Sequence, residues 1–249
     1  MKILITGGQT EVPIDAVRLI AGPFTGRTGL ELAREAHQRG HHVTLALSRR
    51  HAQVAPKVQA ALFPRWRIRE YATVAELWDV LYEELSGAAS ERYDVVIHAA
   101  AVSDYLVQGV FRDPNGPSLC HPGVGKVSSD YPVLWIKLVP APKLIDRLRS
   151  DCGFTGRIVM FKLESQVGEA ELQARAEKAR LRAGADLVVA NTVEERLAWV
   201  LIGPVQDRYL RVPRADLPKR LFDILESIGA RHAEESGPHS EGGSDENGP

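Results

Sequence analysis

Short apolar runs alternate along this chain with longer segments in which apolar and polar residues repeat at helical spacing. Strands covered by helices read as near-continuous apolar runs, and the covering helices are amphipathic. The pattern therefore predicts a mostly parallel sheet with helices on its faces. Strands are expected at Ile3–Ile5, Val43–Leu47, Ile68–Glu70, Val95–His98, Leu134–Leu138, Ile158–Phe161, Leu187–Ala190 and Trp199–Ile202, and helices at Thr28–Arg39, Val74–Ser86, Pro142–Leu148, Glu169–Ala183 and Asp216–Ile228.

Two segments interrupt this alternation. The stretch Leu106–Gly125 is rich in glycine and proline and is too long for an ordinary connection, so we expect a mobile flap over a site. Residues 231–249 are rich in Gly, Ser and acidic residues without apolar periodicity, which predicts a disordered acidic tail. The folded part is then one domain, residues 1–230.

Composition restricts the class of partner. The 249 residues carry a formal net charge of −1, which gives no overall field to attract nucleic acid or an acidic membrane. No window approaches the ~18 consecutive apolar residues of a membrane span, and the N-terminus lacks the features of a signal peptide. We expect a cytoplasmic protein with no nucleic-acid or membrane partner. Cys120 and Cys152 form neither a disulfide framework nor a metal-ligand spacing, so no metal-binding side chains are predicted.

Glycines follow the first expected strand and precede the first expected helix. Gly7 and Gly8 let the backbone approach a phosphate or sugar, or they form a tight turn. A second glycine cluster consists of Gly22, Gly26 and Gly29, and with Thr25 and Arg27 it can present backbone amides and a hydroxyl to an anion at the start of the helix. The G-x-G-x-x-G fingerprint is not satisfied, so the glycines alone do not decide between these alternatives.

The strand expected at Val95–His98 continues into the sequence AAAVSDY. Ligands of open α/β sheets bind beyond the carboxyl ends of the strands. Ala99 and Ala100 leave space for a flat group against the backbone, or they permit close strand–helix packing. Asp104 is placed to hold a ribose hydroxyl or a metal-bound water, or to cap a helix or turn. Together these features predict an α/β, Rossmann-like three-layer fold with a mostly parallel central sheet and a flap.

Several motifs, in order along the chain, resemble those of phosphopantothenoylcysteine synthetases. ITGGQTEVPIDAVRLIAGPFTGRTG is similar to the opening of that family, where a strand, a G-x-T-x-E-x-I-D-x-V-R block and an S-S-G or S-T-G turn follow one another. AAAVSDY, GKVSS, VMFKLES and DLVVANTVEE resemble its later signatures. The resemblance runs from about Met1 to about Ile228.

The resemblance implies a phosphopantothenate–cysteine ligase of coenzyme A biosynthesis. In that family a nucleoside triphosphate, CTP in most bacterial members and ATP in animal ones, activates 4′-phosphopantothenate as an acyl-nucleotide and releases pyrophosphate. The amine of cysteine then attacks to give the amide. Lys, Arg and Mg²⁺ must neutralise the phosphates. The resemblance also implies a homodimer, and because no residues precede the synthetase motifs we expect no flavin-dependent decarboxylase half and no FMN.

The resemblance also assigns individual site residues. Lys126 matches an essential lysine at the end of the flap, which is expected to support charge on the α-phosphate and the leaving pyrophosphate. Phe161 matches an aromatic residue that lies against the base, and Lys178 and Arg182 match a basic pair on one helix face. The remaining expected contacts are Gly8, Ala99, Ala100 and Asp104 for the nucleotide, and Thr10, Arg18, Thr25 and Gly26 for phosphate or substrate.

Two positions depart from the family pattern. Gly22 stands where the family carries an Asn whose amide supports the acyl intermediate. The second half-reaction therefore uses another donor, or it is slow, altered or lost, so a catalytically impaired nucleotide-binding paralogue is an alternative. The run Phe161–Glu164 resembles stand-alone and animal members more than the bacterial fusion form, which leaves CTP and ATP both open.

A short-chain dehydrogenase that uses NAD(P) is the other alternative, because VIHAAAVSD also resembles a strand end of that family. Those enzymes need a tyrosine with a lysine four residues later, and no tyrosine of this chain has one. Their initial G-x-x-G-x-x-G is also missing, so the ligase is the favoured interpretation.

Overall fold

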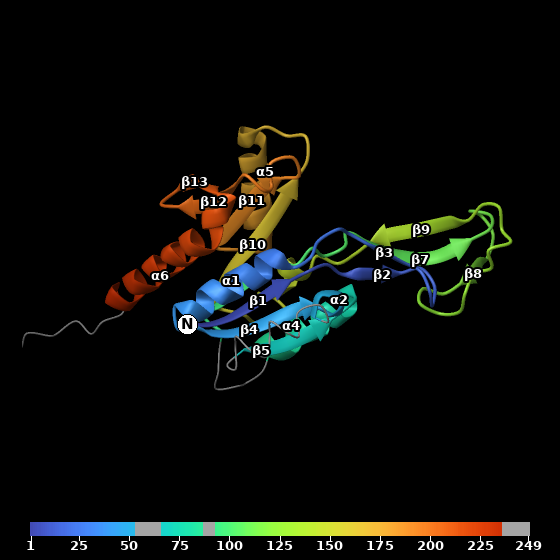
Figure 1. Cartoon of the computed structure of the whole chain (residues 1–249), viewed down its shortest axis with the longest axis horizontal. Coiled ribbons are helices and arrows are strands. Elements are labelled where there is room, and N and C mark those ends of the chain that lie inside the picture. The colour runs from blue at the N-terminus through green and yellow to red at the C-terminus, as the bar shows by residue number, and fades with distance from the viewer. Residues whose placement is uncertain (53–65, 87–92, 236–249) are drawn as a thin grey trace, which may run out of the picture.

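The computed structural model describes residues 1–52, 66–86 and 93–235, and its centre is an eight-stranded sheet (Figure 1). The strand order is β13-β12-β11-β10-β6-β1-β4-β5, so the chain order reverses between β1 and β6. All neighbours from β11 to β5 are parallel, and the last two strands at the other edge are antiparallel. The strands are β1 (Lys2–Gly7), β4 (His42–Ser48), β5 (Arg67–Tyr71), β6 (Val95–His98), β10 (Arg157–Glu164), β11 (Leu187–Thr192), β12 (Trp199–Val205) and β13 (Arg208–Pro213).

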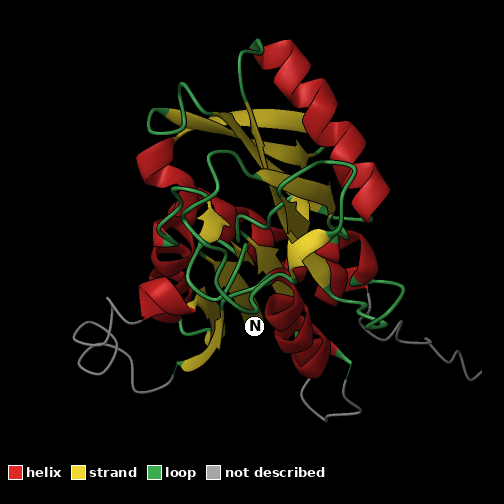
Figure 2. Cartoon of the chain, turned by 90° about the vertical axis from the view of Figure 1, so that its right-hand side faces the viewer, coloured by secondary structure: helices red, strands yellow, loops and turns green. Residues whose placement is uncertain are grey.

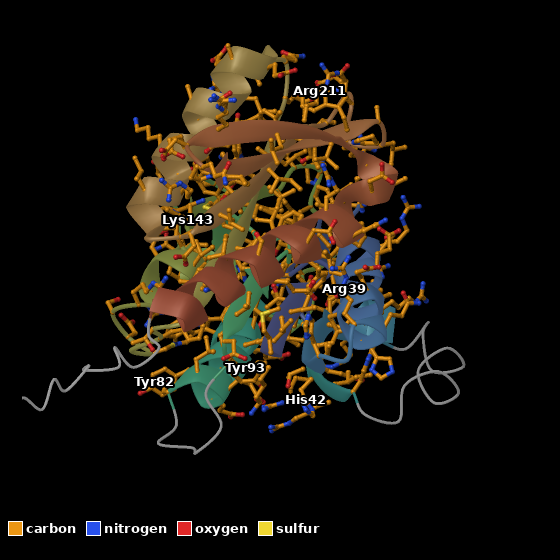
Figure 3. All side chains as sticks on the ribbon, turned by 90° about the vertical axis from the view of Figure 1, so that its left-hand side faces the viewer. Arg39, His42, Tyr82, Tyr93, Lys143 and Arg211 are labelled. Carbon is orange, nitrogen blue, oxygen red and sulfur yellow. The ribbon has the colours of Figure 1, made fainter. Side chains whose placement is uncertain are left out.

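Helices cover both faces of the sheet, and Figure 2 shows them on either side of the strands. α1 (Arg27–Gln38) and α6 (Leu217–Glu235) pack on one face, while α4 (Val74–Leu85), α5 (Glu169–Ala183) and the 3₁₀ helix η1 (Leu144–Arg147) pack on the other. Arg39, at the end of α1, joins α6 through ion pairs of 2.8 Å with both Asp223 and Glu226 (Figure 3). The predicted three-layer fold is therefore confirmed.

Local signals set the ends of the best-predicted helices. Thr73 Oγ1 accepts a hydrogen bond from Glu76 N (3.2 Å) and so caps the start of α4. α5 has the predicted bounds, and it ends at Gly184, whose φ of 59° is the left-handed conformation favoured at helix ends.

The main correction concerns an arm that projects from the body of the molecule (Figure 1). The arm contains the hairpin of β2 (Glu11–Pro13) and β3 (Leu19–Ala21), and a separate antiparallel sheet in the order β8-β7-β9. β9 (Trp135–Pro140) is the apolar run at Leu134–Leu138, which the pattern wrongly assigned to the central sheet. The expected flap, Leu106–Gly125, contains the strands β7 (Tyr105–Phe111) and β8 (Ser118–Cys120). Its mobility and closure stay predictions.

Smaller differences lie in the helices. The helix expected at Pro142–Leu148 is the short η1, and the helix expected to end at Ile228 extends to Glu235, into the region predicted as tail. A short α2 (Arg49–Ala52) follows β4, and η2 (Arg214–Asp216) precedes α6. Residues 236–249 of the predicted tail lie outside the described residues. Within the part of the chain that the structure describes, no helix has the length and apolar character needed to cross a membrane.

Candidate functional site

The carboxyl ends of β1 and β6 lie side by side at the point where the strand order reverses. Such a reversal leaves a crevice beyond the strand ends, and this is where open α/β folds bind ligands. Ala101 N donates to Gly8 O (2.7 Å), and Thr10 N donates to Ala101 O (3.1 Å), so the two segments stay joined beyond the strands. The structure thus brings the predicted Gly8, Ala99 and Ala100 together.

Glycines allow the start of α1 to approach this edge. Gly8 has a φ of +92°, and a Cβ on it would lie 2.1 Å from Ser48 Oγ. Gly26 caps α1 with a φ of +73°, and a Cβ there would lie 3.0 Å from Gly8 N. No side chain caps α1, and Thr25 beside it is exposed. The first amides of a helix have no intrahelical partners, so this arrangement suits the phosphate expected at Thr25 and Gly26.

A buried polar network fixes the segment after β6. Thr10 Oγ1 accepts a hydrogen bond from Ser103 N (2.9 Å) and donates to Ser103 Oγ (3.1 Å). Thr6 Oγ1 accepts from Ala100 N (3.1 Å) and lies 3.1 Å from His98 Nδ1. Burial lowers the pKa of His98 to about 4, so its ring is neutral at physiological pH. The buried hydroxyl of Thr10 thus positions backbone, and its expected contact with substrate stays a prediction.

Asp15 and Arg18 tie the β2–β3 turn to the chain beside Lys126. The buried Asp15 carboxylate accepts hydrogen bonds from Arg18 Nε (3.0 Å) and Val127 N (3.2 Å), while Arg18 Nη2 donates to Val127 O (2.8 Å). Ala16 N donates to the carbonyl oxygen that precedes Lys126 (2.8 Å). The backbone is therefore held on both sides of Lys126, whose side chain is exposed. We call this set of contacts the Asp15–Arg18 clamp.

The clamp changes the interpretation of Arg18. The Arg18 side chain and the amides of Val17, Arg18 and Val127 hydrogen-bond Asp15 and hold the pKa of its carboxyl far below the usual range. Arg18 was expected to contact phosphate or substrate, yet its guanidinium is engaged with Asp15 and Val127. Its side chain remains 42% exposed, so a ligand contact stays a prediction alongside the structural role. The sequence motif pointed to Arg18 but not to its partner Val127, which lies 109 positions later in the chain.

Two further predicted residues lie at the same edge of the sheet. Asp104 forms an ion pair with Lys143, labelled in Figure 3, and both side chains are exposed. β10 pairs with β6 in a register that sets Met160 opposite His98, which places the half-buried Phe161 beside Ala99.

The basic pair on α5 is not brought to this cluster. α5 starts after the carboxyl end of β10 and returns toward the amino end of β11, and Arg182 lies in its last turn. There Arg182 Nε lies 2.9 Å from Asp146 Oδ2. Lys178 is exposed one turn earlier. Contact of Lys178 and Arg182 with phosphate stays a prediction.

An open groove of about 480 Å³ lies beyond the ends of β4 and β5. It is lined by Glu11, Val17, Leu19, Arg49, Arg50 and Ala72. Arg49 within it is paired with Glu76 (3.0 Å). Among the described residues, no group of three or more His, Cys, Asp or Glu side chains is arranged to hold a metal ion.

Comparison with known proteins assigns the chain to a family. Residues 1–200 match the DNA/pantothenate metabolism flavoprotein C-terminal domain. The chain belongs to this family. It is 35% identical over 233 residues to the coenzyme A biosynthesis bifunctional protein CoaBC of Thermococcus kodakarensis. The matched region covers 91% of this chain and 51% of that protein. It is 25% identical over 244 residues to the Escherichia coli protein of the same name, covering 95% of this chain and 53% of that protein.

Solved structures of the family share this fold. The DNA/pantothenate metabolism flavoprotein from Streptococcus pneumoniae aligns with a TM-score of 0.77 at 26% identity, over 93% of this chain and 100% of that one. A Cab2 mutant in complex with phosphopantothenate-cysteine aligns with a TM-score of 0.63 at 16% identity, over 92% of this chain and 88% of that one, and shows the fold alone. The chain spans about half the length of the curated relatives it matches. The family predicted from the motifs is confirmed, which leaves no support for the short-chain dehydrogenase alternative.

Proposed function

We propose that this chain is a phosphopantothenate–cysteine ligase of coenzyme A biosynthesis. The observation that carries the proposal is the glycine-lined edge at the carboxyl ends of β1 and β6, where the strand order reverses, in a chain of this family. Relatives named as coenzyme A biosynthesis bifunctional proteins support a place in that pathway, and the ordered motifs support the choice of substrates.

The first half-reaction is activation of the acid. A carboxylate oxygen of 4′-phosphopantothenate attacks the α-phosphorus of CTP or ATP, the α–β phosphoanhydride bond breaks, and pyrophosphate leaves. The amides at the start of α1 suit the phosphate oxygens, and Lys126 balances charge on the α-phosphate and the leaving group. Phe161 beside Ala99 offers an apolar surface to the base. Mg²⁺ typically binds through substrate phosphates and one or two carboxylates, and the exposed Asp104 is a suitable ligand.

The second half-reaction forms the amide. The amine nitrogen of cysteine attacks the acyl carbon, the bond from that carbon to the nucleotide oxygen breaks, and the nucleoside monophosphate leaves while the amine loses a proton to solvent. Negative charge develops on the acyl oxygen during attack, so a hydrogen-bond donor aimed at that oxygen speeds this step. Gly22 has no side chain to provide such a donor.

We also propose that the arm joins two copies of the chain in a homodimer. Large apolar side chains are exposed along β9 and next to it: Val133 is 58% exposed, Trp135 is 53% exposed on one face of the strand, and Leu138 is 45% exposed on the opposite face. Several large apolar side chains exposed close together are typical of an interaction surface. A second copy would cover it with an equally apolar arm.

The proposed activity is tested by mass spectrometry of the protein with phosphopantothenate, cysteine, Mg²⁺ and either CTP or ATP. We expect pyrophosphate and the amide with at least one nucleotide, and the more efficient nucleotide identifies the preference. If neither nucleotide yields pyrophosphate in the presence of phosphopantothenate, the proposal is wrong. Tight nucleotide binding without turnover would instead support the second candidate, a catalytically impaired nucleotide-binding paralogue. Gly22 at the position of the family Asn is the observation that favours this candidate.

A further inference from the structure

Gln9 places a carboxamide where β1 and β6 meet. It forms an isolated parallel bridge with Ala101, directly after the Gly7–Gly8 pair. Its side chain is almost fully enclosed, since the residue is only 4% exposed. Buried amide groups are costly unless both ends are hydrogen-bonded, so the partners of this side chain indicate its purpose.

Only one end of the Gln9 carboxamide has a partner. Its Oε1 accepts a hydrogen bond from Phe24 N (3.1 Å). A backbone N–H can only donate, so this contact fixes which end is oxygen and which is nitrogen. Within the described part of the chain, Gln9 Nε2 has no hydrogen-bond partner. It is also not fully enclosed by protein atoms. Nε2 therefore keeps two free donor positions and access to solvent at the strand edge.

Gly22 leaves room beside this carboxamide. A Cβ on Gly22 would lie 3.7 Å from Gln9 Oε1 and 3.1 Å from the Phe24 ring. The φ of Gly22 lies outside the left-handed region, so the backbone does not require glycine there. The space next to Gln9 is thus kept open by the lack of a side chain at residue 22.

We propose that Gln9 Nε2 donates a hydrogen bond to the acyl oxygen of the activated substrate when cysteine attacks it. This inference rests on the proposed ligase function. The bond from Phe24 N holds the carboxamide in place before the substrate arrives, and a donor fixed in advance stabilises developing charge without having to reorganise. Gln9 then supplies the polar contact that Gly22 cannot.

Two substitutions separate this role from a structural one. Gln9→Glu keeps an oxygen that can accept from Phe24 N, but it replaces the Nε2 donor with a second oxygen. Gln9→Met has a similar length and removes both the donor and the acceptor. We expect both variants to slow amide formation by about 10²-fold, the typical effect of losing one such donor. Pyrophosphate release should change less, so the acyl-nucleotide should accumulate in a single-turnover assay that follows both products.

Gly22→Asn provides the matched rescue. Because residue 22 lies beside Gln9, an Asn carboxamide there should restore much of the amide formation lost in Gln9→Met, while it should add little to the natural protein. Amide formation at the natural rate in Gln9→Glu, with a loss only in Gln9→Met, would show that Gln9 merely anchors Phe24. Equal slowing of both half-reactions in Gln9→Glu would show charge repulsion instead, and either result overturns the inference. A natural protein that forms no product with CTP or ATP fails at the earlier step, and the inference then falls together with the proposed function.

Discussion

Lys126 is exposed between two backbone positions that are held by hydrogen bonds. The held backbone restricts the region that the flexible Lys126 side chain can reach, which suits a group proposed to stabilise charge in the activation step. We therefore expect Lys126→Gln to lower pyrophosphate release by about 10²–10³-fold, in line with the loss of one preorganised contact. The rate of pyrophosphate release, measured in reactions quenched at successive times, compares Lys126→Gln with the natural protein.

A matched control for Lys126→Gln is Lys219→Gln, which removes an exposed charge on α6. The control should keep natural activity, and circular dichroism should show both variants folded. If Lys126→Gln released pyrophosphate at the natural rate, Lys126 would have no part in activation.

Single residues were predictable from sequence only where the reason was local. Gly8 after the first strand and Gly26 before the first helix lie where the pattern placed them, because a glycine indicates close backbone approach whatever its partner. Their contacts with nucleotide or phosphate stay predictions. The importance of Asp15 and His98 was missed, because it depends on Val127 and Thr6. Those partners are distant in the chain, and no spacing rule reveals them.

At the scale of elements, the approach of α1 to β1 depends on Gly29. A Cβ there would lie 2.9 Å from Gly7 Cα, and backbone cannot move aside as a flexible side chain can. We expect Gly29→Ala to lower the free energy of unfolding by about 1–3 kcal/mol, the usual cost of overpacking. Gly168→Ala is the control, since a Cβ there meets nothing within 4 Å. Gly168 is the N-cap of α5, where Ala is less favourable than Gly, so we expect this control to cost less than about 1 kcal/mol. Urea unfolding of the two variants compares them, and equal stability would contradict the packing argument.

The contact between α5 and β13 should make stability depend on pH. The Glu177 carboxylate accepts hydrogen bonds from the Arg180 guanidinium and from Tyr209 Oη, each 2.6 Å long. These bonds, that from Arg180 most of all, lower the pKa of the Glu177 carboxyl from 4.5 to about 2. A group whose pKa is lower in the folded state stabilises the fold above its unfolded pKa, and that contribution is lost as the pH falls toward the folded value. Glu177→Gln should therefore destabilise the protein at pH 7 more than at about pH 3.

Thermal or urea unfolding of Glu177→Gln at the two pH values checks this expectation. The exposed Glu70 on β5 provides the comparison variant, Glu70→Gln. An identical loss of stability at both pH values would mean that ionisation of Glu177 does not contribute.

Helices were better predicted than the arm, and the reason is environment. α5 combines strong helix formers with a terminal glycine, so its bounds follow from local signals alone. The segment at β9 has the apolar character of a buried strand, yet Trp135, Ile136 and Leu138 are exposed in the arm. An apolar run indicates that something covers it, but not whether the cover is its own sheet or another molecule.

At the scale of the whole molecule, the proposed dimer makes a direct prediction. Sedimentation velocity at micromolar concentration should show a dimer, and Trp135→Glu should shift it toward monomer by placing a charge in the apolar contact. The same substitution should leave the far-ultraviolet circular dichroism unchanged, because Trp135 is half-exposed within one chain. A monomeric natural protein would exclude the arm as a dimer contact.

The predicted closure of the flap is a separate question at this scale. Hydrogen exchange in Leu106–Gly125 should slow when the preferred nucleotide binds, because closure would bury backbone amides that are now at the surface. Exchange that nucleotide leaves unchanged would mean that this part of the arm is a fixed element.

The Asp15–Arg18 clamp has a consequence for the order in which the molecule assembles. The bond from Arg18 to Val127 joins residues 109 positions apart, so it closes a long loop and can form only after the intervening chain has been brought back. The central sheet closes loops of similar length, since Ile3 on β1 pairs with Val95 on β6, so loop length gives the clamp no delay relative to the sheet. During refolding, sheet signals and the proposed pyrophosphate-releasing activity should therefore recover together, because the chain that completes the core also brings both ends of the clamp into place.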